Sequence, residues 1–299
     1  MTDALSAHGI TKRFQGRLVV DGVSMTLSAG SVTAFLGANG SGKTTTLRLM
    51  LGLLHGGGQT LFHGRPLADW RQPARIVGAV FGGVAGHPKH TVAAHLRMAA
   101  AGIGVPAGRV DEVLERVGLQ EAAGRRIGAL SLGMAQRAGI AQALLGNPSV
   151  LLLDEPANGL DPHSILWLRA LLRQLAEEGR AVLVSSHLLA EVEQSADRAV
   201  VLARGRTVAE TSIAELASRA GKRVTVQSPQ LDLLQPLVRE HGGTLEATGP
   251  GAALITGLDR FRIGDYAAEH QIPLHWIEER QPSLEDFYLS VAQQEFEVR

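Results

Sequence analysis

Short apolar segments separated by glycine occupy the N-terminal part of the chain. The segments Leu18–Val20 and Val23–Leu27 lie between Gly16, Gly22 and Gly30. Apolar and polar residues alternate around and within them, and this spacing is typical of strands with one buried face. The pattern therefore predicts short strands of an antiparallel sheet.

Longer apolar runs follow, and they differ in composition. Each of the five runs is mostly apolar and lies next to a segment with helical character: Val32–Leu36, Ile76–Phe81, Val150–Leu153, Ala181–Ser186 and Ala199–Leu202. A run that is apolar on both faces is expected for a strand that helices cover on either side. Alternating strands and helices of this kind predict an α/β fold with a parallel sheet.

Two sets of apolar residues recur at helical spacing between the second and third of these runs. They are Val110, Val113, Leu114 and Val117, and Ile140, Ala141, Leu144 and Leu145. Each set places an apolar stripe on one face of a helix. The dipeptide Asn147-Pro148 ends the second helix, because proline cannot continue it.

After Gly221 the pattern changes to four short β segments with two helical stripes between them. The predicted strands are Val224–Val226, Thr244–Ala247, Ala253–Ile255 and Leu274–Ile277. The predicted stripes are Leu233, Leu234, Leu237 and Val238, and Phe261, Ile263, Tyr266 and Ala267. Strand, helix, strand, strand, helix, strand predicts a small α+β sandwich of ferredoxin-like type. A capping pair then opens a terminal helix with its own stripe: Ser283 with Asp286, and Leu284, Phe287, Tyr288 and Val291.

Composition limits the classes of partner and site. The 29 basic and 29 acidic residues cancel, so no net charge draws the chain to nucleic acid, and we expect no nucleic-acid partner. The absence of cysteine excludes disulfides, iron–sulfur clusters and thiolate zinc sites. No apolar run approaches the roughly 18 residues needed to cross a bilayer, and the N-terminus lacks a secretory pattern. We therefore expect another chain to supply any membrane span.

The stretch GANGSGKT, from Gly37 to Thr44, fits the phosphate-binding pattern G-x-x-x-x-G-K-[ST] at every fixed position. It follows a predicted buried strand and precedes the helix-forming run Leu47–Leu51, which is the setting that the pattern requires. A glycine-rich turn without a ligand is the alternative, and this setting disfavours it. Backbone N–H groups and a helix N-terminus would hold the phosphates of ATP. The predicted binding residues are Gly37, Ala38, Asn39, Gly40, Ser41, Gly42, Lys43, Thr44 and Thr45.

Two carboxylates, Asp154 and Glu155, come directly after the run Val150–Leu153. Ligands of open α/β sheets bind beyond the carboxyl ends of the strands, so this position predicts a magnesium and water site. Acidic residues also end strands simply because loops are solvated. That alternative does not explain why further buried strands follow, the next of them ending at His187.

Five motifs in order resemble the nucleotide-binding subunit of the ATP-binding cassette (ABC) transporter family over about residues 5–218. They are the phosphate loop, the signature-like Leu130–Met134, the strand ending in Asp154-Glu155, the segment Asn158–Asp161, and His187. The resemblance implies a P-loop NTPase cassette in residues 1–218, with a parallel-sheet core, an antiparallel β subdomain and a helical subdomain. Residues 219–299 would then form a C-terminal accessory domain.

The resemblance also implies a role for each matching residue. Phe14 would stack on adenine, and Thr44 and Asp154 would hold Mg²⁺, directly and through water. Glu155 would polarise the attacking water, and His187 would contact the γ-phosphate. Lys43, Mg²⁺ and the loop N–H groups would stabilise the charge on the phosphoryl group that is transferred.

The signature implies a dimer and also shows a departure. In the family, Ser131 and Gly133 face the ATP held by a second subunit, so the resemblance implies a homodimer that sandwiches two ATP molecules. The form Ser131-Leu132-Gly133-Met134 resembles the branch that exports drugs, antibiotics or lipids. The family usually has glutamine after the strand that ends at Phe81, but Gly82 stands there. A side chain that would bind Mg²⁺ and couple to the membrane subunit is therefore missing.

We predict an ATPase that dimerises on ATP and powers a separate integral-membrane permease, as a peripheral subunit on the cytoplasmic face of the membrane. The alternatives are a soluble ABC-type ATPase or an ATP-dependent clamp with little turnover. Members in DNA repair carry a long coiled coil, whereas only about 110 residues without sustained heptads separate Thr44 from Asp154. Members in translation carry two cassettes, whereas each motif occurs once here.

Overall fold

The structure is a computed structural model that describes residues 3–187, 194–213, 215 and 223–280. The chain divides into two compact units, Met1–Ser212 and Ile213–Arg299. The division falls where strand β9 (Arg206–Ser212) ends. The predicted boundary between residues 218 and 219 lies outside the described residues, as does the predicted terminal helix around Leu284.

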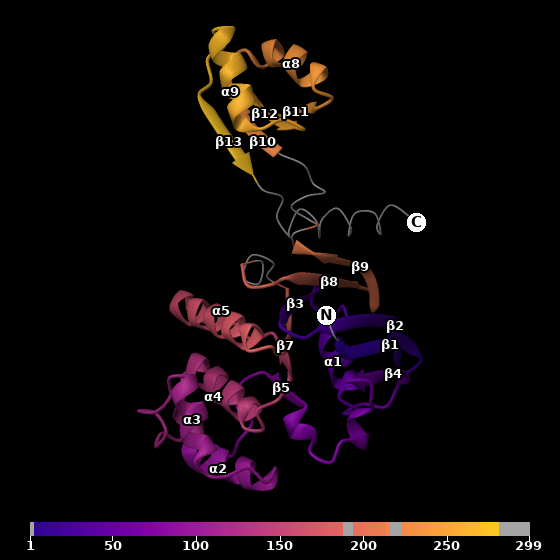
Figure 1. Cartoon of the computed structure of the whole chain (residues 1–299), viewed down its shortest axis with the longest axis vertical. Helices are drawn as coiled ribbons and strands as arrows, with labels where there is room; N and C mark the ends of the chain where they lie inside the picture. Colours follow the sequence, from indigo (N-terminus) through magenta and orange to yellow (C-terminus); the bar gives the residue numbers. More distant parts are fainter. Residues whose placement is uncertain (1–2, 188–193, 214, 216–222, 281–299) are drawn as a thin grey trace. The chain divides into compact units, whose positions relative to one another are not determined.

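A six-stranded sheet forms the centre of the first unit, in the order β5-β6-β7-β3-β8-β9 (Figure 1). The bounds of its first five strands along the chain are Ser31–Leu36 (β3), Val77–Phe81 (β5), Val150–Asp154 (β6), Ala181–Ser186 (β7) and Arg198–Ala203 (β8). Neighbouring strands are parallel except β9, which runs antiparallel to β8. Every residue of β3, β6 and β7 is buried, which confirms the predicted parallel sheet.

The register of three central strands brings their carboxyl ends together. Strand β7 lies between β6 and β3, and it pairs Ser185 with Asp154 and Ser186 with Leu36. Helix α1 (Lys43–Met50) follows β3, and α5 (Pro162–Glu177) packs beside β3 and β7. The loops that carry the predicted site residues therefore meet at one edge of the sheet.

A second, three-stranded sheet is antiparallel and has the order β2-β1-β4. Its strands are Asp3–Phe14 (β1), Arg17–Ser28 (β2) and Gly57–Phe62 (β4). The antiparallel sheet was predicted, but its two short segments are one 12-residue strand, β2. Gly22 has φ 69°, and the register with β1 shifts beside it, so the chain passes an irregularity without leaving the sheet.

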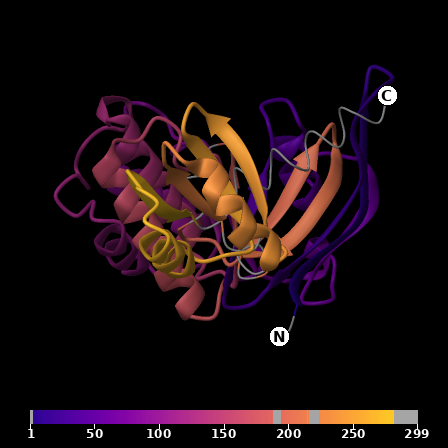
Figure 2. The ribbon, with the colours of Figure 1, turned by 90° about the horizontal axis from the view of Figure 1, so that it is seen from above.

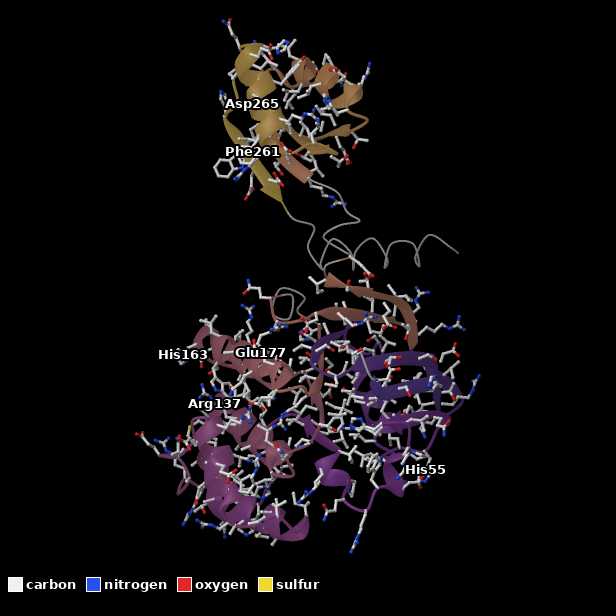
Figure 3. The ribbon with its side chains drawn as sticks, in the orientation of Figure 1. His55, Arg137, His163, Glu177, Phe261 and Asp265 are labelled. Atoms are coloured by element: carbon white, nitrogen blue, oxygen red, sulfur yellow. The ribbon has the colours of Figure 1, made fainter. Side chains whose placement is uncertain are left out.

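Helices α2 (Val92–Gly102), α3 (Arg109–Arg116) and α4 (Leu132–Leu144) pack on one another as a helical group, and α4 also packs on β5 (Figure 1). All eight residues of the two predicted stripes are at most 2% exposed, which confirms both stripes. On α4 the Arg137 guanidinium (Figure 3) lies 4.2 Å from the centroid of the Trp167 ring of α5. Among the described residues, no helix has the length and apolar character needed to cross a bilayer.

The second unit has a four-stranded antiparallel sheet in the order β11-β12-β10-β13. Its elements are Arg223–Gln227 (β10), Gln235–Glu240 (α8), Thr244–Gly249 (β11), Ala252–Thr256 (β12), Arg260–Glu269 (α9) and Trp276–Arg280 (β13). Both helices lie over the same face of the sheet (Figure 2), and residues of both contribute to a single core with it. The order strand, helix, strand, strand, helix, strand agrees with the prediction.

Two residues of the predicted stripes lie outside this core. Leu233 is 50% exposed and Phe261 is 67% exposed. Leu233 lies in a 3₁₀ turn, Leu231–Leu234, ahead of Pro236 near the start of α8, so α-helical spacing does not apply to it. Phe261 lies in the first turn of α9, where the Arg260 guanidinium covers its ring at 4.8 Å.

The last described strand also differs from the prediction. It runs from Trp276 to Arg280 instead of from Leu274 to Ile277. The ladder with β10 begins where Trp276 pairs with Gln227, so the partner strand sets the limits of β13.

Candidate nucleotide site

The predicted phosphate-binding loop connects the end of β3 to α1. Gly42 caps α1 with φ 108°, a conformation that other L residues rarely adopt. Gly37 approaches its neighbours so closely that a Cβ there would lie 2.5 Å from the Leu202 carbonyl oxygen and from Ser41 Oγ. The backbone path therefore requires both glycines. It also places the free N–H groups of the first helical turn beside the loop.

Lys43 folds back over this loop and is 5% exposed. Its Nζ donates to the Gly37 carbonyl oxygen at 2.6 Å and pairs with Glu155 Oε1 at 3.0 Å. A longer contact of 3.4 Å reaches the Ala38 carbonyl oxygen. The oxygens of a polyphosphate can replace the two carbonyl acceptors and give the ammonium hydrogen bonds to negatively charged oxygens.

Asp154 accepts two hydroxyl hydrogen bonds. Thr44 Oγ1 donates to its Oδ2 at 2.7 Å, and Ser185 Oγ donates to its Oδ1 at 2.6 Å. The first contact joins the start of α1 to the end of β6, as the predicted magnesium site requires. Hydroxyl and carboxylate oxygens are the ligands that Mg²⁺ prefers.

Glu155 is held at its backbone and at both carboxylate oxygens. Its N–H donates to Ser185 Oγ at 2.9 Å, while Oε1 pairs with Lys43 and Oε2 lies 2.7 Å from His187 Nδ1. Its φ of 48° is unusual for a residue other than glycine. The structure thus brings together five predicted site residues from the start of α1 and the carboxyl ends of β6 and β7: Lys43, Thr44, Asp154, Glu155 and His187.

Ser185 is the residue that sequence reasoning missed. It is fully buried at the end of β7 and contacts both carboxylate residues. Two serines that end an otherwise apolar strand, Ser185 and Ser186, were the signal that could have identified it.

Two helix caps accompany the other motifs. Ser131 caps α4 by accepting a hydrogen bond from Met134 N at 3.3 Å. Asp161 caps α5 by accepting from Ser164 N at 2.9 Å and from Ser164 Oγ at 3.0 Å. The backbone hydrogen bond from Ser164, followed by the one from its hydroxyl, lowers the pKa of Asp161 below the ordinary 3.8. A Cβ at Gly133 would lie 3.3 Å from Ser164 Oγ, so the start of α4 lies close to α5.

The backbone of the loop after β5 does not suit a glutamine at position 82. Gly82 has φ 78°, a conformation in which a glutamine would be strained. Next to it, a Cβ at Gly83 would lie 3.0 Å from the Ala135 Cβ, and Val84 N donates to the Ala135 carbonyl oxygen at 2.8 Å. This loop therefore packs against α4 through its backbone.

The residues present fit a magnesium triphosphate group. Ser41 Oγ is buried in the phosphate loop and has no hydrogen-bond partner among the described residues. A phosphate oxygen on the loop would supply one, while Thr44 and Asp154 supply oxygen ligands for the metal. Phe14, at the end of β1, is 43% exposed, and Lys12 Nζ lies 5.1 Å from its ring centroid. Its role in binding adenine stays a prediction.

Residues 20–158 match the family model described as ABC transporter. An uncharacterised ABC transporter ATP-binding protein of Bacillus subtilis is 40% identical over 212 residues, which cover 70% of each chain. The chain belongs to the ABC transporter family as an ATP-binding subunit. Such subunits are ATPases coupled to transport, and they use ATP with Mg²⁺.

Further relatives of this ABC subunit carry transport names. The bacitracin transport ATP-binding protein of Bacillus licheniformis is 34% identical over 245 residues, covering 81% of this chain and 80% of that protein. The Nod factor export ATP-binding protein I of Burkholderia lata is 39% identical over 213 residues, covering 68% and 69%. A solved ATP-binding subunit of an ABC transporter superposes with a TM-score of 0.65 at 26% identity, covering 72% of this chain and 92% of that one. The predicted cassette fold is confirmed. Residues 222–285 match a family described as a domain of unknown function.

Proposed function

We propose that this ABC subunit pairs with a second copy around two ATP molecules and drives a membrane permease that exports a drug, an antibiotic or a lipid. The contact set of Lys43, Glu155 and His187 beside the Thr44–Asp154 pair supports ATP hydrolysis. The names of the bacitracin and Nod factor relatives support export. Such a subunit would work at the cytoplasmic face of the membrane, where its permease partner supplies the span.

The contacts of Glu155 suggest how the site is activated. Lys43 contacts Oε1 and His187 contacts Oε2, so each carboxylate oxygen already has a partner in the absence of nucleotide. A triphosphate on the loop would compete with Glu155 for the Lys43 ammonium, because its anionic oxygens also accept charge-assisted hydrogen bonds. Oε1 would then accept the proton of the attacking water, while His187 keeps the carboxylate oriented. His187 would contact the γ-phosphate through Nε2. Bound Mg²⁺ would neutralise charge on the phosphate oxygens.

The second copy would complete each nucleotide site. Leu132, between Ser131 and Gly133 at the start of α4, is 56% exposed. The start of α4 is therefore open to the approach of another subunit. Ser131 and Gly133 would then meet the phosphates of the partner's ATP, Thr45 would help to hold the phosphates on its own loop, and Phe14 would stack on the adenine.

The variant Glu155→Gln tests catalysis against clamping. We expect kcat for phosphate release to fall by roughly two orders of magnitude or more, because the amide cannot take up the proton of the attacking water. ATP affinity should persist, and a dimer should accumulate with ATP in size-exclusion chromatography with light scattering. The control is Glu121→Gln, which changes an exposed carboxylate outside the site. Unchanged turnover in Glu155→Gln would contradict the proposal and support an ATP clamp.

A further inference from the structure

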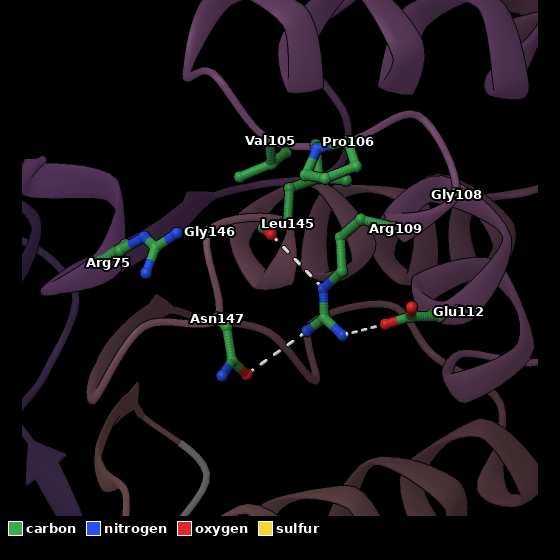
Figure 4. Close-up of a pocket in the computed structure, with 9 residues that line it drawn as sticks. All are labelled: Arg75, Val105, Pro106, Gly108, Arg109, Glu112, Leu145, Gly146 and Asn147. Atoms are coloured by element: carbon green, nitrogen blue, oxygen red, sulfur yellow. Dashed lines mark hydrogen bonds and ion pairs between the residues drawn. The ribbon is translucent and has the colours of Figure 1, made fainter.

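A polar pocket of about 390 Å³ lies where the helical group meets the amino ends of β5 and β6 (Figure 4). Three segments line it: Arg75 ahead of β5, residues 105–112 at the start of α3, and residues 145–147 between α4 and β6. It contains none of the nucleotide-site residues described above. Any ligand in it would contact both the helical group and the segments that lead into the sheet.

Arg109 is held in one orientation at this pocket. Its Nε and Nη2 donate to the carbonyl oxygens of Leu145 and Leu144 at 3.4 and 3.2 Å, and its Nη1 pairs with Glu112. These carbonyls belong to the last turn of α4, where intrahelical partners run out. The Arg109 guanidinium therefore lines the pocket as a positive charge in a fixed position.

Asn147 also lines this pocket. Its Oδ1 accepts from Arg109 Nη2 at 3.3 Å and from Arg180 Nη2 at 2.8 Å, and these two donors decide which amide atom is oxygen. The Nδ2 group is left without a hydrogen-bond partner in the described part of the chain. The backbone φ of 53° shows that Asn147 is held in a conformation that few residues adopt.

Arg75 is the unpaired cation of the pocket. Within the described ranges its side chain makes no hydrogen bond or ion pair, and in Figure 4 its guanidinium points toward Gly146. A Cβ at Gly146 would lie 2.0 Å from the Ala74 carbonyl oxygen, so the two backbone segments are in direct contact. This contact holds the base of Arg75 close to Asn147. The pocket lining has two arginines, Arg75 and Arg109, and one acidic residue, Glu112, so its net charge is positive.

We propose that this pocket binds a small organic phosphate. Its phosphate would lie between Arg75 and the Asn147 amide, and its apolar part would pack on Val105 and Pro106. A planar guanidinium and an amide N–H match the oxygens of a phosphate, and Arg109 adds positive charge. The volume falls within the range of small-molecule sites. The bound phosphate ester would connect the helical group to the amino end of β5, at a distance from the nucleotide loop.

Phenyl phosphate is a suitable probe, because it has one phosphate and one ring. We expect saturable one-site binding to the full chain in isothermal titration calorimetry, with saturating Mg–ADP present to fill the nucleotide site. The variant Arg75→Gln should weaken it by about tenfold or more, because one charge-assisted contact to phosphate is lost. The affinity of Arg75→Lys for phenyl phosphate should lie between those of the wild type and Arg75→Gln, because lysine keeps the charge but lacks the planar pair of N–H donors. Wild-type protein should also melt at a higher temperature with the probe, and the Arg75→Gln protein should not.

The matched control is Arg71→Gln, which removes an exposed arginine of the same segment that does not line the pocket. Its affinity for phenyl phosphate should equal that of the wild type, and phenol should not bind. The proposal is overturned if the wild type shows no saturable binding, or if both glutamine variants behave alike. Binding of an acidic peptide that depends on Arg75, without binding of phenyl phosphate, would assign the pocket to a protein partner and also overturn it.

Discussion

Ser185 uses one hydroxyl to hold both carboxylate residues of the site. It donates to Asp154 and accepts from the backbone of Glu155, and it is completely buried. The left-handed backbone of Glu155, with φ 48°, costs about 1–2 kcal/mol, which the hydrogen bond at its N–H offsets in part. At the residue scale, catalytic geometry thus depends on a side chain that need not touch ATP.

Replacing Ser185 should therefore impair hydrolysis without preventing folding. We expect Ser185→Ala to lower kcat by roughly tenfold or more and to raise the Mg²⁺ concentration at half-maximal rate, because Asp154 loses a donor and Glu155 N loses its acceptor. Phosphate release measured over a series of Mg²⁺ concentrations tests both effects.

Thr33 on the adjacent strand β3 offers the matched control. Its hydroxyl is also buried but has no hydrogen-bond partner among the described residues, so Thr33→Val should leave the rate and its Mg²⁺ dependence unchanged. Equal behaviour of the two variants would show that Ser185 matters only for packing.

At the scale of elements, ion pairs and hydrogen bonds of charged side chains connect the helical group to the central sheet. Arg116 of α3 pairs with Glu178, the C-cap of α5. Arg180, at the start of β7, pairs with Glu178 at 3.1 Å and donates to the Pro148 carbonyl oxygen at 2.7 Å. Since Arg180 also reaches Asn147, the network continues into the pocket beside Arg109. Helix α3 is thus connected to the amino ends of β6 and β7, at the opposite end of the strands from the nucleotide loop.

The pKa of Glu178 gives this network a pH dependence. Burial disfavours the ionised carboxylate, but the hydrogen bonds and charges of Arg116 and Arg180 outweigh it and lower the pKa below the ordinary 4.5. Because the pKa is lower in the folded state, the stabilisation is complete above the unfolded pKa and is lost as the pH falls through the folded one. Glu178→Gln should lower the free energy of unfolding by about 1 kcal/mol at pH 7, a value reduced for partial exposure. Urea unfolding should show this deficit shrinking as the pH falls below 4.5.

Glu177→Gln is the control for that measurement. Glu177 (Figure 3) is exposed, lies next to Glu178 and makes no ion pair within the described ranges. Its substitution should leave stability unchanged at both pH values. A deficit in Glu178→Gln that persists unchanged into acid would contradict the role of the ionised carboxylate.

At the scale of the whole molecule, each of the two units has an apolar cluster of its own among the described residues. A cluster around Phe35, Leu152 and Leu183 lies in the first unit, and a cluster around Val226 and Ile255 lies in the second. Each core is formed within its own unit. The two units should therefore unfold as distinct transitions.

Core truncations should separate these transitions in scanning calorimetry of the full chain. We expect Ile255→Ala to destabilise the second unit by about 2–5 kcal/mol and to lower only one melting transition, because the cavity it leaves is confined to that core. Leu183→Ala, equally buried in β7, should lower the other. Equal movement of both transitions in either variant would show that the units unfold together.

Local spacing accounts for the parts of the fold that were predicted well. The stripes around Val113 and Ile140 are buried as expected, because helix periodicity depends on neighbours along the chain. The limits of β13 and the exposure of Leu233 were predicted wrongly. They depend on a partner strand and on a 3₁₀ turn, which periodicity does not report. The functional roles of Phe14, Ser131 and Gly133 stay predictions.

The amino-acid sequence alone determined the phosphate loop, the order of the motifs and the alternation of strands and helices, because each depends on residues close together in the chain. Only the tertiary structure decided that Lys43 pairs with Glu155, that Ser185 bridges the two carboxylate residues, and that Arg75 shares a pocket with Asn147. These contacts join distant segments. Their geometry follows from strand order, register and close backbone approach, which no local pattern specifies.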